Sequence, residues 1–128
     1  HESRFTYPDY GLVKLLDLGE WWEEETGHPI PLGGILARRS LGEELITKVD
    51  DAIGRSLDYA WQYPQQASAY IASYAQEIDA EVTQRHIELY VNSFSRDLGN
   101  EGVAAIEDLF SRAELRGLIP QSSKSLFV

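Results

Sequence analysis

The stretch that decides the fold reads Asp17-Leu-Gly-Glu-Trp-Trp-Glu-Glu-Glu-Thr-Gly27, followed by His28-Pro-Ile-Pro-Leu-Gly-Gly34. Residues 19–26 have room for a short helix, and Gly27 stands where a helix often ends in a C-terminal cap. Because Trp21 and Trp22 cannot both face the same way on a helix, we expect one to pack inward. The other should cover an adjoining element or the edge of a cleft.

The second part of this stretch predicts an extended segment that ends at a close contact. Pro29 and Pro31 fix their own φ and bias the preceding residue away from the α-helical region, so the backbone should be stiff and extended. Gly33 and Gly34 would then let the backbone pass very close to something else, either a packed neighbour or a ligand.

Two flanking segments predict strands, so we expect a small β-containing start. Val13–Leu18 is apolar apart from one lysine and one aspartate, and Gly11 and Gly19 bound it. Ile35–Arg39 should leave the paired glycines as a second strand. Two strands need partners to satisfy their edges, so we expect this chain to be part of something larger.

From Ser40 onward the apolar spacing is helical. Ser40 and Glu43 match a capping box in front of a long amphipathic helix. Asp79 is a candidate N-cap, and Gly117 follows the last helical stripe. The predicted helices cover residues 41–62, Pro64 to about Ala75, 80 to about Ser93 and about Asn100 to Arg116, with a tail over residues 121–128.

Composition excludes several classes of partner. The chain has 128 residues, 43% of them hydrophobic, which predicts a core of ordinary size. Its formal charge is −10, and a surface of that sign repels nucleic acid and anionic lipid. No stretch approaches the roughly 20 apolar residues of a membrane span. The chain contains no cysteine, so disulfides and cysteine metal sites are excluded within it.

The histidines show no metal-ligand spacing, so we expect no metal site. His86 lies within a helical stripe and His28 in a turn, and both are interpreted as structural. Judged by itself, His1 is typical of a tag remnant or a flexible end.

The chain resembles the 1,4-dihydroxy-6-naphthoate synthases of the futalosine route to menaquinone. The Asp17–Gly27 and Pro31–Gly34 segments together are the most specific part of this resemblance. The chorismate dehydratases, a sister family, are less similar at the same segments. The motifs that carry the resemblance are His1-Glu-Ser-Arg-Phe-Thr-Tyr7, Tyr10-Gly-Leu12, Asp17–Gly27, Pro31-Leu-Gly-Gly34, Arg38-Arg39, Arg85-His-Ile-Glu-Leu-Tyr-Val-Asn92 and Gly117-Leu-Ile-Pro120.

The resemblance implies the C-terminal portion of a type II periplasmic-binding-protein-like fold, in which two α/β lobes hold a substrate between them. Residues 1–29 would end the second lobe, 30–39 would be a crossing strand and hinge, 40–120 would pack on the first lobe, and 121–128 would be a tail. The N-terminal half of the same protein would be the missing partner. The family also implies a cytoplasmic, cofactor-independent lyase with a small-molecule substrate.

The site residues follow from the same resemblance. The family's catalytic histidine begins an H-E-x-R-x-T-Y motif, which places it at His1. It would act as a base on cyclic dehypoxanthine futalosine and start carbon–carbon cleavage. Imidazole suits this role because its unperturbed pKa of about 6.5 leaves much of it neutral near pH 7. Gly33 and Gly34 would lie near the bound substrate.

Other functions stay open at this point. A non-catalytic solute-binding protein could use the same fold, and a signal peptide or lipoprotein cysteine on the missing N-terminus would favour it. Chorismate dehydration is the alternative reaction within the fold. A helical interaction module is the third possibility, and the contiguity of the Asp17–Gly27 match argues against it.

Overall fold

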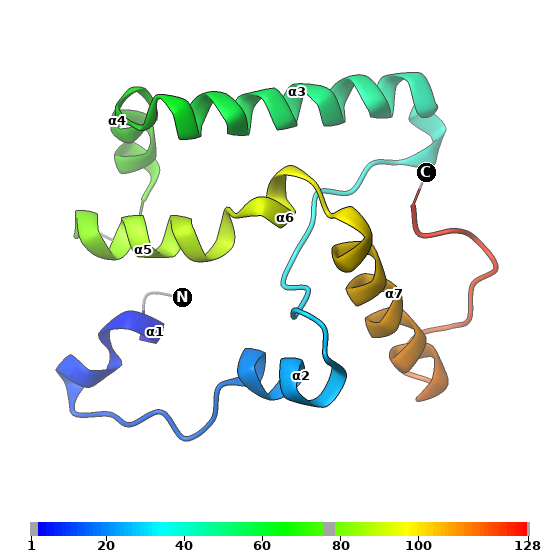
Figure 1. Ribbon diagram of the computed structural model, residues 1–128, viewed down its shortest axis with the longest axis horizontal. Helices are drawn as coiled ribbons and strands as arrows, with labels where there is room; N and C mark the ends of the chain where they lie inside the picture. Colours follow the sequence, from blue (N-terminus) through cyan, green and yellow to red (C-terminus); the bar gives the residue numbers. More distant parts are fainter. Residues whose placement is uncertain (1–2, 76–78, 128) are drawn as a thin grey trace. The chain divides into compact units, whose positions relative to one another are not determined.

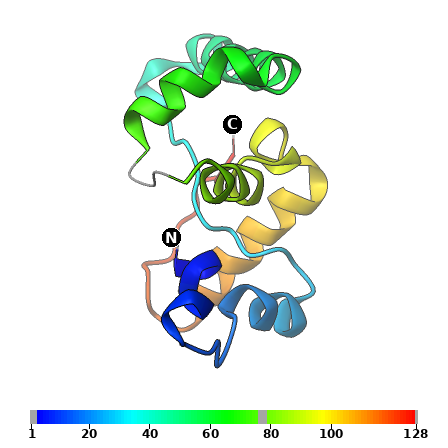
Figure 2. The same ribbon diagram turned by 90° about the vertical axis from the view of Figure 1, so that its left-hand side faces the viewer.

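The computed structural model describes residues 3–75 and 79–127 (Figure 1; Figure 2 gives the side view). In these ranges the regular structure is helical and no β-strand occurs. The mostly helical character predicted after residue 40 is confirmed. The elements are α1 (Ser3–Thr6), η1 (Tyr7–Tyr10), α2 (Leu18–Thr26), η2 (Arg39–Leu41), α3 (Glu43–Gln62), α4 (Pro64–Tyr74), α5 (Ala80–Tyr90), α6 (Ser93–Arg96) and α7 (Gly99–Leu115), where η denotes a 3-10 helix.

The chain divides into two compact units, and one of the points where it passes from one unit to the other falls inside α3. Unit 1 comprises His1–Leu15 and Val49–Asp97, and unit 2 comprises Leu16–Lys48 and Leu98–Val128. Each unit thus joins segments that are far apart in the sequence. The predicted divisions after residues 29, 39 and 120 concern the lobes of a larger protein and stay predictions.

The two predicted strands are wrong for the part of the chain that the structure describes. Residues 12–17 and 29–38 have no helical or strand structure. Most of their apolar side chains are open to solvent, with Leu15 and Leu36 each 93% exposed, whereas residues 29–31 are half-buried. An extended segment becomes a strand only when a neighbour takes up its backbone hydrogen bonds. No described segment does so, and the α/β class predicted from sequence is therefore not seen in the described residues.

The short helix predicted from the opening stretch is confirmed as α2, and local caps define both of its ends. The Asp17 carboxylate accepts hydrogen bonds from the backbone N–H groups of Gly19, at 2.9 Å, and Glu20, at 3.3 Å. These contacts satisfy donors that a helix start leaves unpaired. Gly27 adopts a left-handed φ of 71°, which ends the helix.

The predicted helices of the second half form, with changes at their ends. Asp79 caps α5 as predicted, accepting from the N–H groups of Glu81 and Val82. The helix stops at Tyr90 and does not continue to Ser93. It stops there because Asn92 leaves the helical conformation and starts α6 with a capping box of its own, shared with Ser95.

The predicted capping box at Ser40 does not form. Ser40 lies inside η2, and the first hydrogen bond of α3 runs from the Ile46 N–H to the Gly42 carbonyl oxygen, at 3.1 Å. The short helices α1 and η1 were not predicted, because elements of four residues carry too little periodicity to be recognised.

The prediction of an ordinary core is also wrong for the described residues. The chain exposes 10578 Å², whereas a compact chain of this mass exposes about 6,900 Å² and two compact halves about 8,300 Å². Ala105, 2% exposed, is the buried apolar side chain of the described structure. The apolar faces of the helices and of residues 12–17 are therefore only partly covered by atoms of the described chain.

Gly54 explains how α6 lies against α3 in unit 1. It is the buried residue of α3, and a Cβ there would stand 2.6 Å from Nη1 and 2.8 Å from Cζ of Arg96. The same guanidinium binds Asp58 one turn further along α3, with Nε 3.0 Å from Oδ1. Asp58 raises the pKa of Arg96, chiefly through this hydrogen bond. Glycine at position 54 thus leaves room for an ion pair that joins two helices.

We predict that Gly54→Ala changes the stability by different amounts in two backgrounds. In an Arg96→Ala protein, Gly54→Ala should stabilise the helix by about 0.5–1 kcal/mol, the propensity difference between glycine and alanine. With Arg96 present the gain should shrink or vanish, because the new methyl group displaces the guanidinium from Asp58. Urea unfolding of the four proteins in the double-mutant cycle measures this difference. Additive effects would show that the methyl group and the guanidinium do not compete.

Candidate functional site

The candidate site is the segment that joins α2 to η2 in unit 2, residues 29–38, hereafter the bridge. Its start is held by α2. The Thr26 hydroxyl donates to the Trp22 carbonyl oxygen at 2.8 Å and accepts the His28 N–H at 3.1 Å. A Cβ at Gly19 would stand 3.6 Å from Cγ2 of Ile30, so the first bridge residues pack on the first turn of α2.

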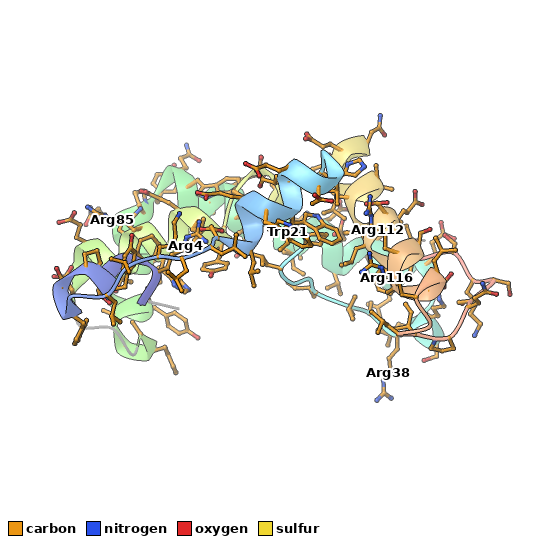
Figure 3. All side chains as sticks on the ribbon, turned by 90° about the horizontal axis from the view of Figure 1, so that it is seen from below. Arg4, Trp21, Arg38, Arg85, Arg112 and Arg116 are labelled. Atoms are coloured by element: carbon orange, nitrogen blue, oxygen red, sulfur yellow. The ribbon has the colours of Figure 1, made fainter. Side chains whose placement is uncertain are left out.

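The other end of the bridge is held by the C-terminal segment. Arg39, the first residue of η2, donates through its guanidinium to the carbonyl oxygen of Ser125. Its neighbour Arg38 is exposed and extends away from the ribbon (Figure 3). The two adjacent arginines therefore have different roles, and only Arg39 ties the bridge to another segment of unit 2 through a contact of this kind.

The middle of the bridge is open. Leu32, Ile35 and Leu36 are largely exposed. A Cβ added at Gly33 or Gly34 would meet no described heavy atom within 4 Å, and neither glycine has a left-handed φ. Neither the backbone conformation nor a described neighbouring atom therefore requires glycine at positions 33 and 34. The close approach that they suggest, to a ligand or to another part of the protein, stays a prediction.

Beside the bridge, α2 packs on α7. The Arg112 guanidinium carbon lies 5.9 Å from the centre of the Trp22 ring, within the range of a cation–π contact. Asp108 holds Arg112 in place through an ion pair of 2.7 Å. Trp21 is 46% exposed on α2. Trp22 thus packs inward, as predicted for one of the pair, whereas the prediction that the other covers an adjoining element or a cleft edge stays a prediction for Trp21.

The sequence-predicted base is not placed by this structure, because His1 lies outside the described residues. His86 lies in α5 with its ring centre 4.6 Å from that of Tyr90, as a packed helix residue. Across residues 3–75 and 79–127, no group of three or more histidine, cysteine or acidic residues could hold a metal ion. In the same ranges, none of the helices has the length and apolarity that crossing a bilayer requires.

Sequence reasoning located the bridge and its glycines but missed its anchors. The contact from Arg39 to Ser125 joins residues 86 positions apart, and no spacing rule connects them. The contact between Arg112 and Trp22 was not predicted either, although each residue was correctly assigned to a helix. Of these anchor residues, Arg39 was named from the sequence only within the Arg38-Arg39 motif that contributes to the family resemblance.

The comparisons with known proteins place the chain in a family. A family model described as menaquinone biosynthesis matches residues 1–115. The match covers most of the chain, which therefore belongs to this menaquinone-biosynthesis family.

Two curated relatives carry a more specific name. The chain is 56% identical over 128 residues to the 1,4-dihydroxy-6-naphthoate synthase of Thermus thermophilus, covering 100% of this chain and 47% of that protein. It is 52% identical over 120 residues to the enzyme of the same name from Streptomyces coelicolor, covering 94% of this chain and 43% of that protein. The chain thus spans about half the length of the curated relatives it matches.

A solved structure shows a similar fold. A crystal structure of a protein from Archaeoglobus fulgidus matches with a TM-score of 0.84 and 36% identity, covering 93% of this chain and 45% of that chain.

The open space at the glycines generates a prediction. In the full-length protein, Gly34→Val should weaken substrate binding far more than it lowers the melting temperature, if the backbone there faces a ligand. Because no described atom crowds position 34, the new side chain should leave unit 2 intact. KM and the thermal midpoint, measured on the same preparation, test this.

Gly27→Ala is the matched control. Its left-handed φ of 71° disfavours any side chain, so alanine should cost about 1 kcal/mol of stability and leave KM unchanged. A Gly34→Val protein that loses stability but keeps its KM would make position 34 a packing site.

Proposed function

We propose that the chain is part of a carbon–carbon lyase that converts cyclic dehypoxanthine futalosine to 1,4-dihydroxy-6-naphthoate in menaquinone biosynthesis. One observation carries this proposal: 56% identity along the whole chain to a protein named 1,4-dihydroxy-6-naphthoate synthase. The match to the menaquinone-biosynthesis family supports the same pathway. The activity belongs to the whole protein, of which this chain corresponds to about half the length of the relatives.

The remaining part of the protein would complete the fold. Residues 12–17 and 29–38 are rich in apolar residues, leave Leu15 and Leu36 largely exposed, and form no β-ladder with another described segment. These are the properties of strands that lack their sheet. We assign them to a two-lobed α/β fold of the type II periplasmic-binding-protein kind, with residues 30–39 crossing between lobes and 40–120 packing on the first. The N-terminal half of the protein is then the partner that covers them.

Within this scheme His1 is the general base. A neutral imidazole would accept the proton whose removal starts cleavage of the carbon–carbon bond, which releases the sugar-derived fragment and leaves the aromatic naphthoate. A positioned base of this kind contributes about 10²–10⁴ in rate. The assignment rests on the His1–Tyr7 motif that the chain shares with the family.

The glycines of the bridge would form the other contribution of this chain to the site. Gly33 and Gly34 lie in the open middle of a segment that is held at both ends. Without side chains, they would let the backbone approach the substrate closely. Closure of the two lobes over the substrate would orient it and exclude water.

The test uses the complete protein incubated with cyclic dehypoxanthine futalosine, with naphthoate followed by absorbance and mass. We expect turnover by the wild type and a loss of about 10²–10⁴ in kcat for His1→Ala, the usual contribution of a general base. His86→Ala is the matched histidine control and should keep its activity, because His86 packs on Tyr90 within α5.

Three results would contradict the proposal. Full turnover by His1→Ala would remove the proposed base. A wild-type protein that forms no naphthoate but dehydrates chorismate would belong to the sister activity, and one that binds a solute without converting any substrate would be a binding protein.

A further inference from the structure

The C-terminal segment of unit 2, residues 118–127, folds back along α7 and is hereafter called the strap. The reversal begins at Gly117, whose φ of 67° lies in the left-handed region. The Gly117 N–H donates to the Glu114 carbonyl oxygen and the Leu118 N–H to that of Ala113, each at 2.9 Å. These bonds close the last turn of α7 and send the chain back towards η2 (Figure 1).

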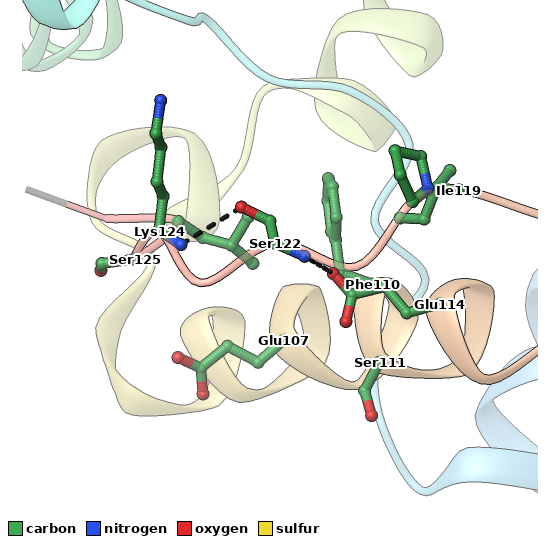
Figure 4. Close-up of a pocket in the computed structure, with 10 residues that line it drawn as sticks. Glu107, Phe110, Ser111, Glu114, Ile119, Ser122, Lys124 and Ser125 are labelled. Atoms are coloured by element: carbon green, nitrogen blue, oxygen red, sulfur yellow. Dashed lines mark hydrogen bonds between the residues drawn. The ribbon is translucent and has the colours of Figure 1, made fainter. Parts of the chain in front are cut away.

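Beyond this turn, two further polar contacts hold the strap. Near its middle, the Ser122 N–H donates to Oε1 of Glu114 at 3.1 Å (Figure 4). Near its end, the carbonyl oxygen of Ser125 accepts from the guanidinium of Arg39. The first contact ties the strap to α7, and the second ties it to the residue that directly follows the bridge.

Apolar packing covers only part of this attachment. A hollow of about 560 Å³, open to solvent, lies between the strap and α7. Of its apolar lining residues, Phe110 and Leu126 are 40% and 41% exposed, while Ile119 is half-buried. Because side chains fill only part of the space between the strap and α7, the polar contacts should contribute to where the strap lies.

We propose that Arg39 is a positioning residue: held by the strap at Ser125, it fixes the far end of the bridge and so presents Gly33 and Gly34 to the substrate. The near end is already fixed by Thr26 and by the contact of Ile30 with α2. A segment fixed at both ends loses less conformational freedom when a ligand binds. The functional part of this inference rests on the proposed lyase activity.

The experiment compares Arg39→Ala, Arg39→Lys and Arg116→Ala with the wild type, all as full-length protein. Arg116 also lies in unit 2, is exposed and is an arginine, so its loss matches the change in charge. Hydrogen exchange read by mass spectrometry reports on peptides from the strap and from the bridge. A peptide from α5 in unit 1 serves as the reference for general loosening.

We expect Arg39→Ala to speed exchange in both the strap and the bridge, by about three- to tenfold for the loss of one hydrogen bond. The α5 peptide should exchange as in the wild type. KM should rise by a similar factor while kcat stays within about twofold, because the bridge must then be ordered at the expense of binding. Arg39→Lys should recover part of both effects, since an ammonium group also donates to a carbonyl oxygen. Arg116→Ala should change neither.

Unchanged exchange in the strap would overturn the anchor, and faster exchange in the strap without faster exchange in the bridge would overturn the positioning role. A lower melting temperature with unchanged KM would make Arg39 purely structural. If the wild type shows no turnover, the lyase assignment fails, whereas the exchange of the bridge still decides whether Arg39 holds it. Glu114→Ala, which releases Ser122 alone, gives a second and weaker perturbation of the strap should Arg39→Ala fail to fold.

Discussion

Backbone hydrogen bonding determines which segments of this chain form regular secondary structure from their own residues and which need a partner. A helix pairs its own N–H and C=O groups along its length, and only its ends need outside partners. An extended segment pairs none of its groups internally and depends on a neighbouring strand. The helices α3 and α7 therefore form from their own residues, whereas residues 12–17 and 29–38 form no ladder and leave most of their apolar side chains in solvent. Every feature of the candidate site lies on or beside such an open segment.

What could be predicted from the sequence follows the same division. The caps at Gly27 and Asp79, the proline at the start of α4 and the glycine after α7 are local signals, and each was identified correctly, whereas the N-terminal cap Asp17 was assigned to a strand. The strands were not, because an apolar, β-prone stretch shows what a segment suits and not whether its partner is at hand. The prediction of an ordinary core was wrong for the same reason, because apolar composition does not show whether covering atoms are present.

For the candidate site, the sequence indicated individual residues but not the residues that they contact. The paired glycines were singled out because two adjacent residues without side chains allow a close backbone approach, but no described residue makes the contact that we propose for them. Arg39 and Ser125 meet across 86 positions, and Arg96 and Asp58 across 38. No periodic pattern links such residues, so only a three-dimensional structure pairs them. His1 was assigned from family resemblance and not from the physical chemistry of its neighbours.

The contact between Gly54 and Arg96 has an evolutionary consequence. A side chain at position 54 and a guanidinium from position 96 compete for the same space. Substitutions at the two positions should therefore be correlated among homologous proteins. Glycine at 54 should accompany arginine at 96 and an acid at 58, while alanine or larger residues at 54 should occur with a shorter residue at 96. This three-position signature would mark lineages in which α6 is held to α3 by charge and distinguish them from lineages in which apolar packing has taken over.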